Sequence, residues 1–311
     1  MVTIKIEAND KEQRLDRFLR KYLKEAPLSY IYRLIRKDLK VNGKRAKEDR
    51  VLEEGDELTL YVSEQEIAPL IRKAGGRTGR VDLDICYEDD DLIAVNKPFG
   101  LLTHGDEKEK KNHLANRVVD YLIAKGEYDP AKEKSFRPAP SNRLDRNTTG
   151  IVLFGKNADT ARRLNRMLKE RDGASKYYLT IVKGRIAGEL RLTGALAKDE
   201  EKNRVSVGGE GRESETVVRP IKAAKGYTLA EVELLTGRTH QIRAHLADAG
   251  HPVIGDPKYG DPRVNRIMKE KYGLTAQLLH AYKVSLPGLD IEAAEPALFE
   301  KIEKDLFGDR E

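Results

Sequence analysis

Residues 141–150 read SNRLDRNTTG and run directly into the apolar stretch 151–154, IVLF. Within the first stretch, Asp145 is an acidic side chain between Arg143 and Arg146. Neighbouring guanidinium groups lower the pKa of a carboxylate, so that it stays ionised near neutral pH and can act as a nucleophile or a base. Asp, Asn and Gly are also common turn formers, and a surface turn with an ion pair is therefore the competing interpretation.

The apolar stretch 151–154 predicts a short buried strand, and similar patterns surround it. Residues 92–95 form another apolar run, which ends at Lys97-Pro98. Together the periodic segments predict a domain of mixed α and β structure. Its expected helices cover 114–122, 161–168 and 239–250, its further strands cover 177–182, 216–221 and 227–235, and 188–211 supplies turn-rich connections.

The motif around Asp145 resembles the catalytic motif of the RluA family of pseudouridine synthases, which reads HRLDxxTSG. Asn142 stands where the family usually has His, and Thr149 stands where it usually has Ser. The Thr for Ser exchange keeps a hydroxyl group. Asn in place of His removes a titratable ring but keeps hydrogen-bond donors and acceptors, so it bears on packing or pH response more than on Asp145.

Four further segments resemble the family in the same order along the chain. They are 96–101 (NKPFGL), 176–178 (KYY), 236–245 (TGRTHQIRAH) with 250–256 (GHPVIGD), and 278–281 (LLHA). Five matches in order are far more specific than one short motif. The resemblance implies an α+β catalytic domain, built on a mainly antiparallel mixed sheet with flanking helices, that converts uridine to pseudouridine in RNA.

The resemblance also implies roles for four side chains. Asp145 acts at the ribose, either by attacking C1′ or by removing the C2′ proton, and the sequence leaves both routes open. Because the target nucleotide must leave the RNA stack, Arg143 is expected to enter the vacated space, and Tyr178 to stack on the flipped uracil. Arg243 is expected to pair with Asp145. Without the resemblance, Tyr178 reads as a core residue and Arg243 as a helix-surface residue.

No cofactor is expected for this reaction, since it oxidises nothing and adds nothing. The sequence contains neither a GxGxxG fingerprint after a strand nor a Walker loop. A metal site is also not expected. His240 and His245 are five positions apart, which is about 140° around a helix, whereas paired ligands on one helix face prefer a spacing of four. His280 is expected to be a packed structural residue.

The composition of the 311-residue chain restricts its class. Charged residues make up 35% and hydrophobic residues 39%, and the net charge is +6. No apolar run approaches the roughly 20 residues that span a bilayer, so no membrane association is expected. A single cysteine, Cys86, allows neither an internal disulfide nor a cysteine-based zinc site. These features fit a cytoplasmic protein, which we expect to act as a monomer.

The first sixty residues predict a small separate unit. An apolar stripe from Leu15 to Leu23 predicts a helix with Asp10 as N-cap, and Ser29 is expected to cap a second helix. A strand at 39–41, a tight turn at Asn42-Gly43 and a strand at 58–62 follow. This order resembles the alpha-L RNA-binding domain found in a ribosomal small-subunit protein and in many rRNA-modifying enzymes, with the match covering residues 12–62. A small α+β domain with a hydrophilic exterior is the competing interpretation.

Basic residues gather in the second half of this unit. Between Ser29 and Arg50 the sequence has eight basic and three acidic residues, a local excess of +5. Such a surface neutralises RNA phosphates and releases their counterions. The predicted contact residues are Arg33, Arg36, Lys37, Lys40, Lys44 and Arg45. The expected organisation is an RNA-binding domain over 1–62, a basic flexible linker over 63–80 and a catalytic domain over 81–311.

These observations predict a pseudouridine synthase that acts on large-subunit (23S) ribosomal RNA. Residues 29–37, SYIYRLIRK, most resemble the branch C large-subunit rRNA enzymes of the family. Two alternatives stay open at this point. One is a pseudouridine synthase acting on tRNA, and the other is a non-catalytic rRNA-binding assembly factor, for which Asn142 is the one encouraging feature.

Overall fold

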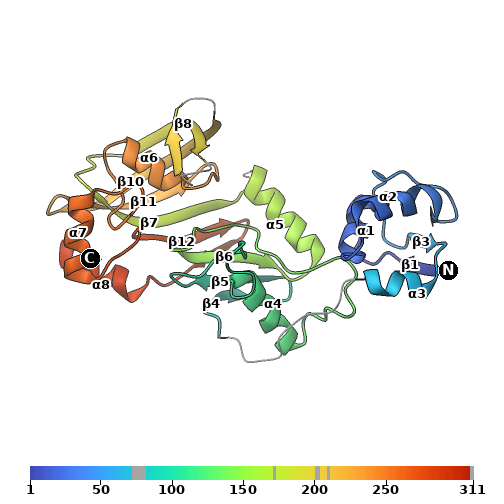
Figure 1. Ribbon diagram of the computed structural model, residues 1–311. Helices are drawn as coiled ribbons and strands as arrows, with labels where there is room; N and C mark the ends of the chain where they lie inside the picture. The colour runs from blue at the N-terminus through green and yellow to red at the C-terminus, as the bar shows by residue number, and fades with distance from the viewer. Residues whose placement is uncertain (72–81, 171–172, 200–203, 209–210, 309–311) are drawn as a thin grey trace.

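In the computed structural model, which describes residues 1–71, 82–170, 173–199, 204–208 and 211–308, the chain forms two units with one β-sheet each (Figure 1). The N-terminal unit has a three-stranded antiparallel sheet in the order β1-β3-β2. Two helices cover this sheet, and their apolar stripes, which include Phe18, Leu19, Ile31 and Leu34, form its core. The elements are β1 (Val2–Lys5), α1 (Leu15–Tyr22), α2 (Leu28–Lys37), β2 (Leu39–Val41) and β3 (Glu57–Leu60).

The tight turn predicted at Asn42-Gly43 is present. Both residues have positive φ, 51° and 74°, and the Val41 amide donates to the Lys44 carbonyl. Only Lys44 pairs with Val41 after the turn, and the strand that pairs with β2 along its length is β3. The turn therefore presents Lys44 and Arg45 at the end of a short, exposed loop.

Both predicted helix caps of the N-terminal unit are wrong. Helix α1 begins at Leu15 and follows Arg14, because Asp10 instead accepts a hydrogen bond from the Ser135 hydroxyl at 2.7 Å in the other unit. Helix α2 begins at Leu28, so that Ser29 lies inside its first turn. The carbonyl of Pro27 already accepts the first amides of α2, which makes Pro27 the residue that starts the helix.

Residues 63–71, predicted as the start of the linker, have regular structure. Ser63 caps the short helix α3 (Glu64–Ile67) by accepting from the Glu66 amide, and a 3₁₀ turn over Ala68–Leu70 follows. Ile67 is buried in the core of the N-terminal unit. The apolar side chains of this segment therefore attach it to the unit. The rest of the predicted linker, 72–80, lies outside the described residues.

The second unit contains a ten-stranded sheet in the order β4-β5-β6-β12-β7-β11-β10-β8-β9, with β13 beside β12. Its strand pairs are antiparallel except for β6 with β12. This agrees with the predicted sheet, which was expected to be mainly antiparallel. The strands are β4 (Ile85–Glu88), β5 (Leu92–Lys97), β6 (Thr149–Gly155), β7 (Ser175–Lys183), β8 (Leu190–Asp199), β9 (Arg204–Val207), β10 (Arg212–Ala224), β11 (Tyr227–Leu234), β12 (Leu279–Leu286) and β13 (Leu289–Glu292).

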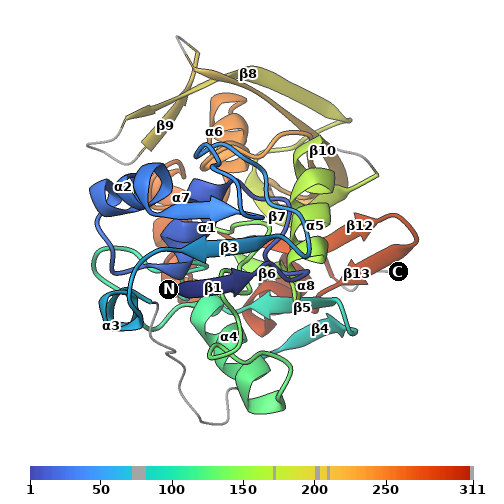
Figure 2. The same ribbon diagram turned by 90° about the vertical axis from the view of Figure 1, so that its right-hand side faces the viewer.

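The prediction of turn-rich connections over 188–211 is wrong, because β8 and β9 pair there as antiparallel neighbours (Figure 2). The alternation of Leu190, Leu192 and Leu196 with more polar residues is typical of a half-buried strand. The glycine and the charged residues of this segment make the two-residue alternation hard to recognise in the sequence. This β8–β9 pair lies at the edge of the sheet beside α6 (Gln241–Asp248).

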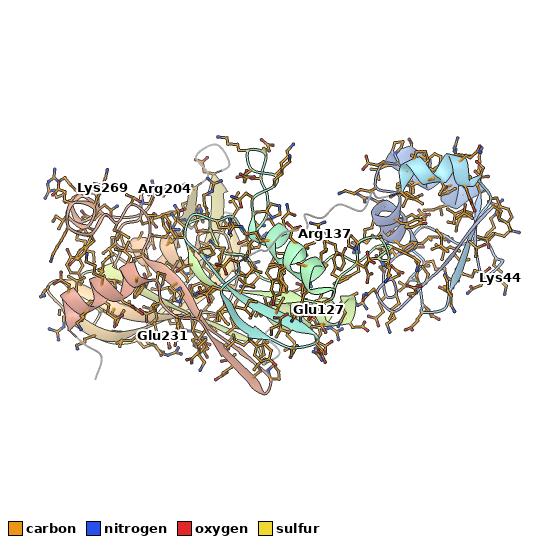
Figure 3. The ribbon with its side chains drawn as sticks, turned by 90° about the horizontal axis from the view of Figure 1, so that it is seen from below. Lys44, Glu127, Arg137, Arg204, Glu231 and Lys269 are labelled. Atoms are coloured by element: carbon orange, nitrogen blue, oxygen red, sulfur yellow. The ribbon has the colours of Figure 1, made fainter. Side chains whose placement is uncertain are left out.

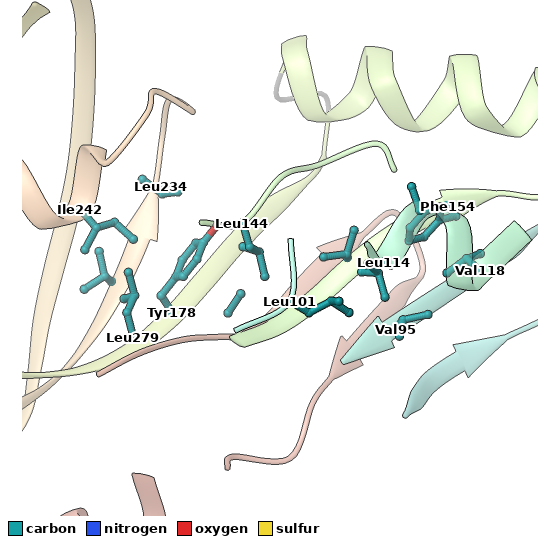
Figure 4. Packing of buried hydrophobic residues seen from close by; sticks show 14 of the residues in the cluster. Val95, Leu101, Leu114, Val118, Leu144, Phe154, Tyr178, Leu234, Ile242 and Leu279 are labelled. Carbon is teal, nitrogen blue, oxygen red and sulfur yellow. The ribbon is translucent and has the colours of Figure 1, made fainter. Parts of the chain in front are cut away.

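Helices cover both faces of the larger sheet. Alternate residues of β6 point to opposite faces, so Val152 and Phe154 pack with Val118 of α4 (Leu114–Lys125) (Figure 4), whereas Ile151 and Leu153 pack with helix α5 (Ala158–Glu170). Helices α7 (Pro262–Tyr272) and α8 (Ala297–Phe307) contribute to another buried cluster with β7 and β11. None of the helices described here is long and apolar enough to cross a lipid bilayer.

Polar contacts hold the two units together at the start of α5 (Figure 1). The side-chain oxygen of Asn9 accepts from the Ala158 amide at 3.0 Å, at the first turn of α5. Gln13 donates to the Ser135 hydroxyl at 2.8 Å, next to the Asp10 contact. Arg162 donates to the Lys11 carbonyl at 3.1 Å. These directional contacts define how the N-terminal unit sits on the larger one.

Candidate active site

Asp145 lies in the turn that leads into β6. Its carbonyl accepts from the Thr148 amide at 3.1 Å, and its side chain is 29% exposed. The backbone on both sides of it is held. The Thr103 hydroxyl accepts from the Leu144 amide at 3.2 Å and donates to the Leu144 carbonyl at 2.9 Å, while Lys97 donates to the Arg146 carbonyl at 2.9 Å. The carboxylate is therefore reachable from solvent on a fixed backbone.

Lys97 is fully buried. Its ammonium group donates to the carbonyls of Pro98, Leu101 and Arg146. Burial lowers the pKa of Lys97 to about 7, against the opposing attraction of Asp145. Lys97 therefore joins the segment after β5 to the turn that carries Asp145.

Asn142, which differs from the usual residue of the family, binds the backbone of β6. Its amide nitrogen donates to the Ile151 carbonyl at 2.9 Å, and its amide oxygen accepts from the Leu153 amide at 2.9 Å. The side chain thus copies the donor and acceptor of a peptide group in a neighbouring strand. This pairing fixes the start of the turn against β6, three residues before Asp145.

Arg243 lies on α6 and joins two carboxylates. Its Nη1 atom donates to Asp145 Oδ2 at 2.8 Å, and its Nε and Nη2 atoms donate to Asp256 at 2.7 and 2.9 Å. The arginine side chain is 5% exposed and Asp256 is fully buried. Burial opposes ionisation of Asp256, but the Arg243 guanidinium outweighs it and lowers the pKa of that carboxyl group. Asp256 therefore holds Arg243 in the direction of Asp145.

Tyr178 lies on β7 and is 5% exposed. It belongs to the same buried cluster as Leu144, Ile242 and Leu279, so it is near both segments that supply the ion pair. Figure 4 shows its hydroxyl directed toward Leu144, the residue before Asp145. The structure therefore gathers three of the predicted site residues, Asp145, Tyr178 and Arg243, in one region.

The predicted RNA-contacting residues fall into two groups. Arg143 is exposed two positions before Asp145, whereas the N-terminal basic residues lie on the other unit. Figure 3 shows Lys44 at the end of the N-terminal unit that faces away from the larger unit. Arg45 donates to the Arg36 carbonyl, which brings the tight turn next to α2. On that unit Arg33, Arg36, Lys37, Lys44 and Arg45 are exposed and Lys40 is half-buried.

Sequence reasoning gave no role to Asp256, Tyr259, His240, Lys97 or Thr103. The first four lie in or beside segments that match the family motifs, and that proximity was the available signal. His240 Nε2 lies 3.8 Å from Asp145 Oδ2, and its Nδ1 lies 3.0 Å from the Tyr259 hydroxyl. Thr103 carries no motif signal. It matters through a contact with a residue 41 positions away.

No group of three or more His, Cys, Asp or Glu side chains with the geometry of a metal site occurs among the residues that the structure describes. Two of the buried histidines bind hydroxyl or carbonyl groups of the protein. His245 contacts the hydroxyls of Ser214 and Thr216, and His280 contacts the Thr149 hydroxyl and the Ala293 carbonyl. His280 is fully buried, so it is a packed structural residue, as predicted.

A cavity of about 470 Å³ adjoins the site. It is lined by Val95, Lys97, Leu101, Leu114 and Thr149, among others, with the half-exposed Phe99 at its side. Asp145 and Tyr178 are not part of its lining, so we do not assign it to the reacting base.

Comparisons with known proteins find a family match and relatives over most of the chain. Residues 91–248 match the RNA pseudouridylate synthase family. The chain is 34% identical to the ribosomal large subunit pseudouridine synthase C of Vibrio cholerae, over 94% of this chain and 88% of that protein. It is 35% identical to the protein of the same name from Escherichia coli, over 92% of this chain and 89% of that protein.

Two solved human structures share the fold. RNA pseudouridylate synthase domain containing 1 is 23% identical, with a TM-score of 0.53, over 71% of this chain and 86% of that chain. RNA pseudouridylate synthase domain containing 4 is 22% identical, with a TM-score of 0.55, over 70% of this chain and 91% of that chain. The family match and the close bacterial relatives settle the assignment: the chain belongs to the RNA pseudouridylate synthase family.

Proposed function

We propose that this protein acts as a monomer and isomerises uridines to pseudouridine in large-subunit ribosomal RNA. One observation carries the proposal. The Asp145 carboxylate is held by the buried Arg243 guanidinium at 2.8 Å and yet remains 29% exposed. A carboxylate that is paired with a buried guanidinium and is also open to solvent can contact the ribose of an RNA that binds there.

The isomerisation breaks the N1–C1′ bond of uridine and forms a C5–C1′ bond. The C5 proton is lost and N1 gains a proton, so atoms balance without an oxidant, a metal or a nucleotide cofactor. Among the described residues, the basic side chains within 4 Å of the Asp145 carboxylate, Arg243 and His240, both approach Oδ2. Oδ1 is thus the oxygen that we assign to the ribose, either for attack on C1′ or for removal of the C2′ proton.

The remaining catalytic roles are proposed from the family resemblance, and the positions of the residues support them. Tyr178, at the buried end of the same region, is proposed to stack on the flipped uracil. Arg143 is exposed beside Asp145, and its planar guanidinium is proposed to occupy the space that the nucleotide leaves. Arg243 is proposed to orient Asp145.

The choice of RNA rests on two supports. Both named bacterial relatives are large-subunit enzymes, and they match this chain over more than nine-tenths of its length. The N-terminal unit has exposed basic residues on α2 and on the turn after β2, as it also has on α1. We propose that residues 1–62 form an alpha-L domain that binds rRNA phosphates and that 81–311 form the catalytic domain.

The test uses the loss of the C5 proton. Large-subunit rRNA and bulk tRNA are transcribed with [5-³H]uridine and incubated with the full-length protein, and tritium released to water is counted. Asp145→Asn is the matched control. Release from the rRNA alone is expected. Tritium release only from tRNA would show that tRNA, and not rRNA, is the substrate. Tight rRNA binding without tritium release would indicate a non-catalytic assembly factor.

A further inference from the structure

A chain of three contacts connects the edge of the sheet to Asp145. The Val205 amide on β9 donates to the Tyr259 hydroxyl oxygen at 2.7 Å. That hydroxyl lies 3.0 Å from His240 Nδ1. On the far side of the same ring, His240 Nε2 lies 3.8 Å from Asp145 Oδ2. Tyr259 and His240 thus form a path from a backbone amide to the carboxylate of the proposed active site.

The direction of these contacts fixes where the imidazole proton lies. Since the Val205 N–H donates to the Tyr259 oxygen, the phenol hydrogen is left to donate elsewhere. Within the described part of the chain, its one acceptor in reach is His240 Nδ1. Neutral imidazole has one N–H, so an accepting Nδ1 places that hydrogen on Nε2. The Nε2–H group then faces Asp145.

Tyr259 is held firmly enough to act in this way. It is 7% exposed, and its own amide donates to Asp256 Oδ1 at 3.1 Å. The guanidinium groups of Arg204 and Arg243 lie 5.2 and 5.1 Å from the centre of its ring. Both distances are within the range of cation–π attraction. The ring therefore contacts the β8–β9 hairpin and the arginine of the ion pair at once.

His240 is held in an unusual backbone conformation. Its φ of 52° lies in the left-handed region, and it is the N-cap of α6 without a side-chain cap bond. Residues other than glycine adopt this region infrequently, and they do so at functional sites when the surroundings enforce it. Its ring also packs edge-on against Tyr259, with ring centres 5.7 Å apart. Backbone and ring contacts together aim Nε2 at Asp145.

We propose that Tyr259 is a positioning residue that keeps His240 in its Nε2–H form, so that His240 is a second donor facing Asp145 beside Arg243. The proposal rests on the proposed function.

The first test reads the tautomer directly and needs no activity. The full-length protein is labelled with [¹⁵N]histidine, and the two nitrogen shifts of His240 are measured at about pH 8, where an ordinary imidazole is neutral. His240→Gln identifies the signals. The expected result is an unprotonated, hydrogen-bonded Nδ1 and a protonated Nε2. In Tyr259→Phe the two nitrogens should move toward the averaged shifts of a mixture. A wild-type Nδ1–H would overturn the proposal.

The second test asks whether the position of the donor nitrogen matters, and not only the presence of a polar side chain at residue 240. The amide of Gln reaches the place of Nε2, whereas that of Asn reaches the place of Nδ1. His240→Gln should therefore keep the single-turnover rate within about threefold. His240→Asn and Tyr259→Phe should slow it by about three- to tenfold, because the donor that faces Asp145 is then lost or no longer fixed. Affinity for rRNA should not change. Equal rates for His240→Gln and His240→Asn would contradict the proposal.

Tyr128→Phe is the matched control, since Tyr128 is also buried and its hydroxyl donates to the Phe136 carbonyl at 3.1 Å, outside this path. Its rate should equal that of the wild type, and the melting temperatures of both tyrosine variants are compared. If the wild-type protein fails to release tritium, the proposed function fails. The nitrogen shifts would still decide the tautomer.

Discussion

Arg243 donates to Asp145 over 2.8 Å, although the two residues are 98 positions apart in the chain. The contact exists because α6 presents the guanidinium beside the turn that precedes β6, and because Asp256 takes the other edge of the same group. Asp145 is thereby oriented and partly exposed, while its partner is buried. Of the two carboxylates that Arg243 binds, Asp145 is therefore the one that a substrate can reach.

Asp145→Asn should abolish pseudouridine formation and leave folding and RNA binding unchanged. The amide has the shape of the carboxylate but lacks the negative charge that acts at the ribose. Tritium release measures the first effect, and thermal melting with filter binding of rRNA measures the second. Asp106→Asn is a control at an exposed carboxylate nearby, which pairs with Arg146 at 3.6 Å. Retained turnover in Asp145→Asn would remove this residue from the mechanism.

Asp256→Asn should destabilise the larger unit by about 3–5 kcal/mol, as expected when one partner of a buried ion pair is removed. Arg243 would keep only the exposed Asp145 as an anionic partner among its present contacts. Denaturant unfolding measures the change in stability. Activity should fall as well, because Arg243 no longer has a fixed direction, and a stable, fully active variant would contradict this assignment.

The same residue predicts a pH effect. The folded-state pKa of Asp256 is lowered below its unfolded value of about 3.9. Its stabilisation is therefore complete above about pH 4 and is lost as the pH falls through the lowered pKa. The free energy of unfolding should fall less steeply with acid in Asp256→Asn than in the wild type. Parallel pH profiles would show that Asp256 does not drive this effect.

The sequence predicted much of the fold because its periodic segments are long. The apolar stripes of α1, α4 and α5 and the buried run of β6 needed no tertiary knowledge. Residues such as Thr103, Asp256 and Tyr259 could not be assigned in that way, since their roles consist of contacts with distant segments. The prediction of Asp10 as a helix cap was wrong for the same reason, because Asp10 accepts a hydrogen bond from the other unit and does not cap its own helix.

Asn142→Asp should destabilise the protein at neutral pH, whereas Asn142→His should be tolerated. The carboxylate can accept from the Leu153 amide but cannot donate to the Ile151 carbonyl, so two acceptors would face each other. Neutral imidazole has one donor and one acceptor, as the amide does. The expected cost of Asn142→Asp is about 1–3 kcal/mol for the unsatisfied carbonyl. Thermal melting and tritium release check both variants.

Asn9→Ala should weaken the junction between the two units. Its side-chain oxygen accepts from the Ala158 amide in the first turn of α5, and its amide donates to Glu133 at 2.8 Å. Loss of one such hydrogen bond costs about 1 kcal/mol. Thermal melting should show the corresponding loss of stability. Lys5→Ala, at an exposed position of the same unit, is the control and should behave as the wild type.

Reversing charge at Arg36 and Lys37 together should lower rRNA affinity and its dependence on salt. Both residues are exposed on the last turn of α2. For every phosphate that the variant no longer neutralises, the slope of log affinity against log salt should decrease by about 0.7 to 0.9. The matched control reverses Arg163 and Arg166, which are exposed on α5 and change the net charge equally. If both double variants shift the slope by the same amount, the N-terminal unit contributes only bulk charge and not a binding surface.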